Sequence, residues 1–382
     1  MISKFTNPHN MYRKEDAMRV ENVPNGIVLP QRACEEEKPM WGLGGVCDGN
    51  NKFVELSYYD GNWATHGGVY TWEEEDYCED TAIYLGVFFK HWGHFLIDLV
   101  GRAWYLARHD SSKAKIVYLG DEEIPGNFLE FFELLGIRKD QLLRIQKPTR
   151  FKDVIVPEYS ASSCVWYTEE YLSIFSAIAE KVKAEELDFA VPEKVYFTRL
   201  GFGKAKQSEV GEEYLAAWLS ANGYTLVSPE KLSLRQQVHI WNQAKSIACL
   251  DGTIPLNVNF SNNKDLQLLV MHKTSLEHQN LEMSLLMRPC NVTLLDAYWE
   301  PFDGYPKSIG AGPFLLCVSD DVVEYSKQAD LVMPFTEKDR KKQRKKSRRK
   351  LKRIIVNFKG RLRAFLSKMT PSFIKKALGR GK

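Results

Sequence analysis

The segment that decides the fold is FFKHWGHFLIDL, residues 88–99. It continues an apolar run that starts at Ile83 and is long enough for a buried strand. The run breaks at Trp92-Gly93, and apolar residues then recur at helical spacing through Leu106. This pattern predicts a buried strand that leads through a short polar turn into a helix. In α/β enzymes, ligands tend to bind where such a strand ends.

Four polar residues fall on one side of the predicted helix. At 100° per residue they lie within roughly 80° of one another, opposite the apolar residues, and are His91, His94, Asp98 and Arg102. We expect this side to face a cleft. His94 and Asp98 fit a catalytic pair, in which one is the general base and the other orients it. Two alternatives are an i,i+4 polar pair that caps a buried helix and, with His91, a divalent-metal site.

The order of predicted elements indicates an α/β fold. Strands and helices alternate from residue 83, and the alternation restarts after a polar linker at 185–193. The predicted strands are 83–89, 115–119, 142–145, 153–156, 194–198, 225–227, 246–250 and 267–271, and the predicted helices are 94–108, 126–136, 168–187, 209–222, 233–244 and 252–260. We expect two Rossmann-like domains, 1–187 and 188–335, that face a cleft, followed by a basic tail at 336–382.

The composition excludes several classes of protein. The seven cysteines are scattered and never form a Cys-x-x-Cys pair, so neither a disulfide framework nor a zinc knuckle is expected. The N-terminal residues lack the apolar core of a signal peptide, and no apolar run approaches the ~20 residues needed to span a bilayer. We expect a cytoplasmic protein.

The second half contains two places where a phosphate group could bind. Arg199 ends a predicted strand and is followed by a glycine-containing loop with Lys204, a combination that suits a diphosphate. An exposed basic loop is the alternative. Asp251-Gly252-Thr253 joins a strand to a predicted helix, whose free N–H groups would favour a phosphate. An ordinary turn capped by Thr253 fits equally well.

Together these segments resemble glycosyltransferase family 61, which contains many bacterial capsular-polysaccharide transferases. The resemblance covers roughly residues 80–300 and rests on four segments in order: HWGHFLID (91–98), VYFTR (195–199), SPEKLSLRQQ (228–237) and DGTIPLN (251–257). The last segment departs from the family pattern, because Asp251 and Thr253 stand where the family usually has His and Ala. 

The resemblance implies a GT-B-like arrangement of the two domains, with the donor on the second and the acceptor on the first. It also implies a metal-independent, inverting transfer of a sugar from a nucleotide-sugar donor, with no cofactor, in surface-polysaccharide synthesis. His94 and Asp98 would be catalytic, and His91, Trp92 and Arg102 would lie on the acceptor side. The donor would contact Arg199, Lys204, Glu209, Glu230, Asp251, Gly252, Thr253 and Asn257. The departures at 251 and 253 motivate an alternative: an inactive relative that acts as a membrane-bound glycan-binding or assembly subunit.

The C-terminal tail differs sharply in charge from the rest of the chain. Residues 338–382 contain 20 Lys or Arg and one acidic residue, whereas the preceding residues contain 32 basic and 48 acidic ones. Apolar residues of the tail fall in an arc of roughly 120° and include Ile354, Ile355, Phe358, Leu362 and Phe365.

This pattern is typical of a helix that lies on an anionic membrane surface. We expect peripheral attachment to the inner face of the cell membrane, beside a lipid-linked glycan acceptor. Two alternatives are docking of the apolar stripe on the protein's own core and nucleic-acid binding. The acidic body and the apolar stripe count against nucleic acid as a partner.

Overall fold

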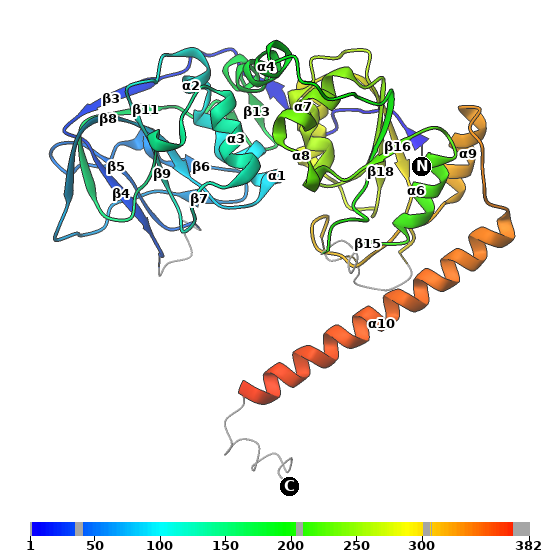
Figure 1. The fold of residues 1–382 in the computed structure, drawn as a ribbon. Helices are drawn as coiled ribbons and strands as arrows, with labels where there is room; N and C mark the ends of the chain where they lie inside the picture. Colours follow the sequence, from blue (N-terminus) through cyan, green and yellow to red (C-terminus); the bar gives the residue numbers. More distant parts are fainter. Residues whose placement is uncertain (1, 35–40, 204–208, 301–305, 307, 370–382) are drawn as a thin grey trace, which may run out of the picture.

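The protein is a mixed α/β structure built around two main sheets (Figure 1). The computed structural model describes residues 2–34, 41–203, 209–300, 306 and 308–369, with side chains of the last helix through Val356. The described helices outside the functional site are α3 (Gly126–Leu134), α4 (Glu169–Ala184), α6 (Glu212–Ser220), α7 (Leu234–Gln243), α8 (Gln279–Met287), α9 (Asp320–Gln328) and α10 (Glu337–Met369), with 3₁₀ turns η1 (Glu55–Ser57), η4 (Lys139–Gln141) and η5 (Pro229–Lys231).

The first sheet has the strand order β10-β9-β8-β11-β4-β5, with β3 also paired to β11. Its strands are β3 (Val20–Pro24), β4 (Ile27–Arg32), β5 (Leu43–Cys47), β8 (Asp76–Val87), β9 (Lys115–Leu119), β10 (Leu142–Arg144) and β11 (Thr149–Pro157). The four strands from the α/β alternation pair in parallel, as expected, whereas the strands before residue 50 join antiparallel to them. The first sheet is therefore mixed rather than wholly parallel.

The second sheet has the order β1-β19-β18-β17-β14-β16. Its strands are β1 (Ile2–Ser3), β14 (Lys194–Phe197), β16 (Thr225–Val227), β17 (Ser246–Leu250), β18 (Gln267–His272) and β19 (Asn291–Asp296). All are parallel except β1, which pairs antiparallel with β19 and brings the start of the chain into this sheet. The predicted strands 225–227 and 246–250 are confirmed to the residue.

Three small sheets complete the fold. They are β2 (Tyr12–Arg13) with β12 (Ala161–Ser162) and β13 (Trp166–Tyr167), β6 (Tyr59–Asp60) with β7 (Thr65–His66), and β15 (Glu209–Val210) with β20 (Phe314–Leu315). The last pair explains why the helix expected from residue 209 starts at Glu212: residues 209–210 pair with β20 instead.

The single helix expected over residues 94–108 is wrong. The segment is divided into α1 (Trp92–His94), a π-helical turn η2 (Phe95–Leu99), a 3₁₀ turn η3 (Val100–Arg102) and α2 (Trp104–Arg108). Because π and 3₁₀ turns do not advance by 100° per residue, Arg102 leaves the common face that a regular α-helix would give it. The helix expected at 252–260 is likewise a 3₁₀ segment, η6 (Ile254–Phe260).

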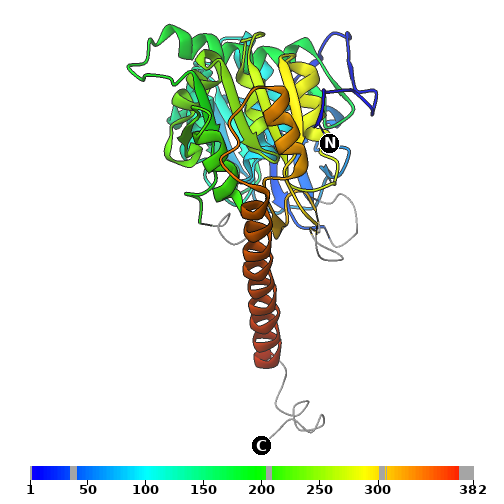
Figure 2. The ribbon, with the colours of Figure 1, turned by 90° about the vertical axis from the view of Figure 1, so that its right-hand side faces the viewer.

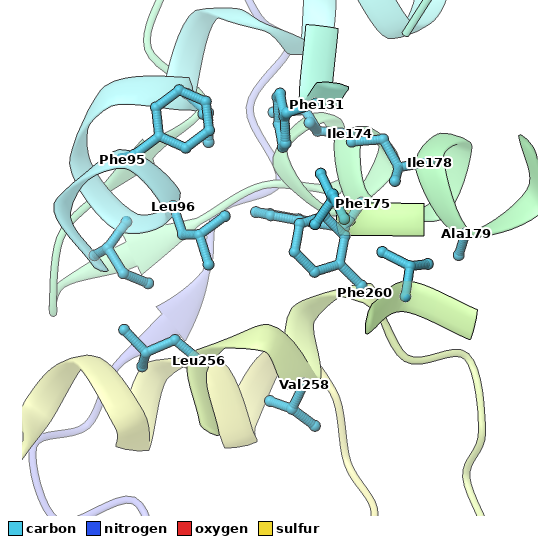
Figure 3. Close-up of a cluster of buried hydrophobic side chains, with 14 of the residues drawn as sticks. Phe95, Leu96, Phe131, Ile174, Phe175, Ile178, Ala179, Leu256, Val258 and Phe260 are labelled. Carbon is cyan, nitrogen blue, oxygen red and sulfur yellow. The ribbon is translucent and has the colours of Figure 1, made fainter. Parts of the chain in front are cut away.

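One apolar cluster joins the layers of both sheets. The Phe260 ring of η6 lies 5.2 Å from that of Phe175 in α4 and 6.3 Å from that of Phe131 in α3. Figure 3 shows Leu256 of η6 facing Leu96 across this cluster, to which Val258 also belongs. The two halves of the chain thus share a continuous core.

The first part of α10 packs on the protein's own surface. Leu351 is buried against Val210 and Leu315 of the β15–β20 pair, and Ile354 and Ile355 are half-buried beside it. Beyond this contact the helix projects away from the body (Figure 2). Docking on the protein, one of the alternatives for the tail, therefore holds for Ile354 and Ile355, while the side chains of Phe358, Leu362 and Phe365 lie outside the described residues. Among the described residues, no helix is long and apolar enough to cross a membrane.

We predict that Val258→Ala lowers the free energy of unfolding by about 2 kcal/mol, because it removes two buried methyl groups from the shared core. Val332→Ala is the matched control, since Val332 is 61% exposed. Denaturant titration of both variants measures the difference. Equal stability of the two variants would contradict the shared-core account.

Candidate functional site

His94 and Asp98 form a hydrogen-bonded pair at the start of the irregular helix. His94 Nδ1 donates to Asp98 Oδ2 at 2.8 Å. The Asp98 side chain is fully buried, whereas that of His94 is 30% exposed. Among the described residues the His94 Nε2 atom has no hydrogen-bond partner. The pair therefore presents one imidazole nitrogen outward and fixes the other.

The β6–β7 hairpin completes the surroundings of the Asp98 carboxylate. Tyr59 Oη and Trp63 Nε1 both donate to Asp98 Oδ1, at 3.1 and 3.2 Å. The Trp63 ring also lies 4.4 Å from the His94 ring. Burial raises the pKa of Tyr59 far above its usual value, with a further contribution from the Asp98 charge, so its hydroxyl stays a donor. Three donors thus stabilise the buried carboxylate.

His91 lies beside the pair and caps α1. Its Nδ1 atom accepts from the backbone N–H of His94 at 3.3 Å, and the two imidazole rings are 4.5 Å apart. Burial lowers the pKa of His91, and the adjacent His94 lowers it further. The neutral form is therefore favoured, which matches its role as an acceptor.

Arg102 does not face a cleft, contrary to expectation. The guanidinium is fully buried and donates to the backbone oxygens of Pro157, Leu56 and Tyr58. Gly86, at a bulge in β8 with φ +102°, leaves the space for it: a Cβ there would lie 3.0 Å from Arg102 Nη1. Arg102 therefore supports the structure behind the site.

The turn at residues 91–94 touches the second half of the chain. Trp92 Nε1 donates to Asn257 Oδ1 at 2.8 Å. A Cβ on Gly93 would lie 3.4 Å from Thr253 Oγ1 and 3.6 Å from a methyl carbon of Leu256. The structure therefore brings the predicted acceptor-side turn against the predicted donor-side turn. The Asn257 side chain also donates through Nδ2 to the backbone oxygen of Ile254, at 3.1 Å.

Cationic side chains gather at the carboxyl edge of the second sheet. Arg199 follows β14, and Lys273 follows β18. Buried Glu209 joins them, accepting from Arg199 Nε at 2.6 Å and from Lys273 Nζ at 3.1 Å. The Lys273 ammonium also lies beside Gly252, where an added Cβ would be 3.2 Å from Nζ. Arg199, Lys273 and the Glu209 carboxylate together carry one net positive charge.

Asp251 faces two imidazoles instead of open space. It is buried and accepts from His272 Nδ1 at 3.1 Å and from His278 Nδ1 at 2.6 Å. Burial opposes ionisation, but the two imidazole hydrogen bonds prevail and hold the pKa of Asp251 well below its usual range. Burial also lowers the pKa of His272, yet the Asp251 hydrogen bond and charge raise it above its usual value. The carboxylate is thus compensated internally.

The remaining candidates have separate places. Glu230 is exposed in η5, close to Gly201, where an added Cβ would be 2.6 Å from its Oε1. Lys204 lies outside the described residues. Among the described residues, no group of three or more His, Cys, Asp or Glu side chains is arranged to hold a metal ion.

Sequence reasoning missed several residues of this site. They are Tyr59, Trp63, Glu212, His272, Lys273 and His278. Glu212 is buried and accepts from the backbone N–H of Arg199 at 2.7 Å and from Thr198 Oγ1 at 2.8 Å. A signal existed for Lys273, because it follows a parallel strand at the same edge as Arg199 and Asp251. No sequence signal pointed to Tyr59 and Trp63 of the hairpin, since their contact with Asp98 depends on tertiary packing.

Residues 92–267 match the family model described as Glycosyltransferase 61. This match covers 176 of the 382 residues, so it is a similarity over somewhat less than half of the chain. The matched range contains His94, Asp98, Arg199 and Asp251, and ends just before His272 and Lys273. The family implies a glycosyltransferase that uses a nucleotide-sugar donor and a glycan acceptor. No curated protein gave a significant match to the chain.

We predict that Asp251→Asn flattens the pH dependence of the protein's stability. A raised His272 pKa contributes stability that is complete below about pH 6.5 and is lost as pH rises through the folded-state pKa. The depressed Asp251 pKa contributes above about pH 4 and is lost only in stronger acid. The advantage of wild type over the variant should therefore shrink between pH 6 and pH 9.

Thermal melting across this pH range measures the effect. Asp265→Asn is the control, because it makes the same change at an exposed position. Parallel melting curves for Asp251→Asn and wild type across the range would refute the proposed coupling.

Proposed function

We propose that the protein is an inverting, metal-independent glycosyltransferase in which His94 is the general base and Asp98 orients it. The observation that carries this proposal is the asymmetry of the pair: His94 is partly exposed, and its Nδ1 is fixed by a fully buried carboxylate. A carboxylate with three donors and no exposed surface is poorly placed to take a proton from an acceptor. The exposed imidazole nitrogen is well placed for it.

The reaction would be a single displacement. As the acceptor hydroxyl oxygen bonds to the anomeric carbon of the donor sugar, its proton passes to His94 Nε2. The bond between that carbon and the diphosphate oxygen breaks, and the departing diphosphate takes the electron pair. Its negative charge would be stabilised by Arg199, Lys273 and backbone N–H groups near Gly252. The contact of Gly93 with Thr253 supports this arrangement, because it joins the base-carrying turn to the cationic edge.

Asp251 bears on the choice between an enzyme and an inactive relative. A free carboxylate beside a diphosphate would oppose donor binding. Its two histidine partners offset this charge and add imidazole groups at the same edge. The departure from the family pattern is therefore compatible with activity, and we favour the enzyme over the inactive glycan-binding or assembly subunit.

We further propose that the two halves act as a GT-B-like pair, with the donor on the second half and the acceptor on the first. The acceptor would be a lipid-linked glycan of a surface or capsular polysaccharide. The basic tail would place the enzyme on the inner face of the cell membrane. Support for the last point is the charge of residues 338–382, with 20 basic residues against one acidic residue.

We predict that Asp98→Asn lowers kcat by about 10²–10⁴-fold, because the amide would donate to His94 Nδ1 and leave Nε2 protonated. His94→Gln should cause a comparable loss. Donor binding, measured by calorimetry with nucleoside diphosphates, should change little in both variants.

His109→Gln is the control for the histidine change, since His109 also follows a helical turn and stacks on an aromatic ring, that of Tyr105. Transfer and donor hydrolysis are assayed over a panel of nucleotide-sugars. Full activity of His94→Gln would exclude His94 as the base. A wild-type protein that binds glycans but turns over no donor would favour the inactive relative.

We predict that neutralising four exposed tail residues, Lys345, Lys346, Arg349 and Lys350, by Gln substitution weakens binding to anionic vesicles strongly. Each basic residue near an anionic surface contributes about 1 kcal/mol. Flotation with phosphatidylserine vesicles measures the loss, and vesicles of neutral lipid should bind neither protein. Four exposed lysines of the body, changed to Gln together, are the control: Lys52, Lys139, Lys147 and Lys152. Equal loss in both sets would argue against a specific role of the tail.

A further inference from the structure

A pocket of about 730 Å³ opens in the first half of the chain, separate from the exposed face of His94. The β6 strand, the η1 turn, the end of β11 and the β12–β13 region line it. Its lining residues include Tyr58, Tyr59, Tyr159, Trp166, Glu55 and Asp60. None of the catalytic steps above uses this pocket.

The aromatic side chains of the pocket suit a sugar ring. Tyr58, Tyr159 and Trp166 are each half-buried, and the rings of Tyr59 and Tyr159 lie 4.9 Å apart. The C–H faces of a sugar are apolar and pack on aromatic rings, while its hydroxyls need hydrogen-bond acceptors. Carboxylates at Glu55 and Asp60 supply such acceptors, and among the described residues their side chains form no ion pair or hydrogen bond.

The charge of the pocket restricts which sugars fit. Arg19 and Glu158 neutralise each other through two hydrogen bonds, of 2.9 and 3.1 Å. Glu21, Glu55 and Asp60 add three carboxylates to the lining. Two cations lie against its aromatic walls, Lys14 at 4.8 Å from the centre of the Trp166 ring and Arg102 at 3.9 Å from that of Tyr159, so the net charge is still negative. A sugar that carries a carboxylate or phosphate would be repelled, whereas a neutral or amino sugar would not.

The walls of the pocket are held in place from behind by Arg102. Its guanidinium donates to the backbone oxygens of Leu56 and Tyr58 and lies 3.9 Å from the centre of the Tyr159 ring. A pocket whose walls are fixed before binding loses less entropy when a ligand enters. This gives the buried guanidinium a part in shaping the site, although it touches no acceptor.

Tyr59 connects the pocket to the proposed catalytic pair. It lines the pocket, and its hydroxyl donates to Asp98, which accepts from His94. The pocket is therefore two hydrogen bonds from the proposed base. A ligand there would lie on the acceptor side of the site.

We propose that this pocket binds a sugar unit of the acceptor glycan and selects neutral or amino sugars against acidic ones. The assignment of this sugar to the acceptor rests on the proposed function, whereas sugar binding in the pocket does not depend on it. The chemistry of the pocket thus indicates a class of acceptor sugar, which the family similarity does not specify.

Calorimetry on the full chain tests the proposal with three probes: the glucosamine trimer, chitotriose and the galacturonic acid trimer. Wild type should bind the first two at millimolar concentrations and the third at least tenfold more weakly. Trp166→Ala should weaken chitotriose binding at least tenfold. Circular dichroism and thermal melting confirm that each variant is folded.

A charge-reversed pocket gives a second, independent readout. Glu55→Lys with Asp60→Lys should invert the preference between the glucosamine and galacturonic acid trimers. Asp121→Lys with Glu122→Lys is the matched control, because it makes the same charge change at exposed residues outside the pocket. Its preference should remain that of wild type.

Several outcomes would overturn the proposal. They are no binding of either neutral or amino trimer by wild type, a wild-type preference for the acidic trimer, and equal shifts in the pocket and control variants. Donor hydrolysis by wild type tests the proposed function separately. Trimer binding without donor turnover would support the sugar-binding pocket and contradict the proposed enzyme activity. Donor turnover without trimer binding would support the enzyme activity and contradict the sugar-binding pocket.

Discussion

The contact between the turn at 91–94 and the segment 253–257 is the constraint on which the candidate site depends. Trp92 donates a hydrogen bond to Asn257, and Gly93 lies beside Thr253, where an added Cβ would be in van der Waals contact with Oγ1 at 3.4 Å. Phe260 continues the same contact into the shared apolar core. A hydrogen bond alone contributes about 1 kcal/mol. Together with the packed core beside it, however, this hydrogen bond fixes the position of the turn relative to the second half of the chain. The histidines of the first half and the cations of the second half are therefore held at one place.

Buried carboxylates organise both sides of this contact. Asp98 is satisfied by an imidazole, a phenol and an indole, and Asp251 by two imidazoles. Glu209 is satisfied by Arg199 and Lys273. Because burying a charge without partners is costly, each carboxylate fixes the orientation of the groups around it. In the candidate site, the carboxylates therefore fix the positions of the imidazoles and cations that are bonded to them.

The sequence predicted much of the framework and part of the site. Strands such as 115–119 and 246–250 could be placed because buried parallel strands are short apolar runs between turn residues. The contact of His94 with Asp98 survived the change of helix type, since four residues span one turn in either case. Arg102 did not, because the π-helical turn and the 3₁₀ turn rotate it into the interior. No spacing rule predicts such irregular turns.

The sequence by itself determined which chemical groups the protein has and which strands and turns carry them. Apolar periodicity and turn residues act between residues that are close in the chain, so their effects can be predicted from the sequence. Only the tertiary structure decided which groups meet. It buried Asp98 and left His94 partly exposed, turned Asp251 toward His272 and His278, and brought Tyr59 from a distant hairpin to Asp98. The reason is physical: exposure and partnership depend on the packing of elements far apart in the chain.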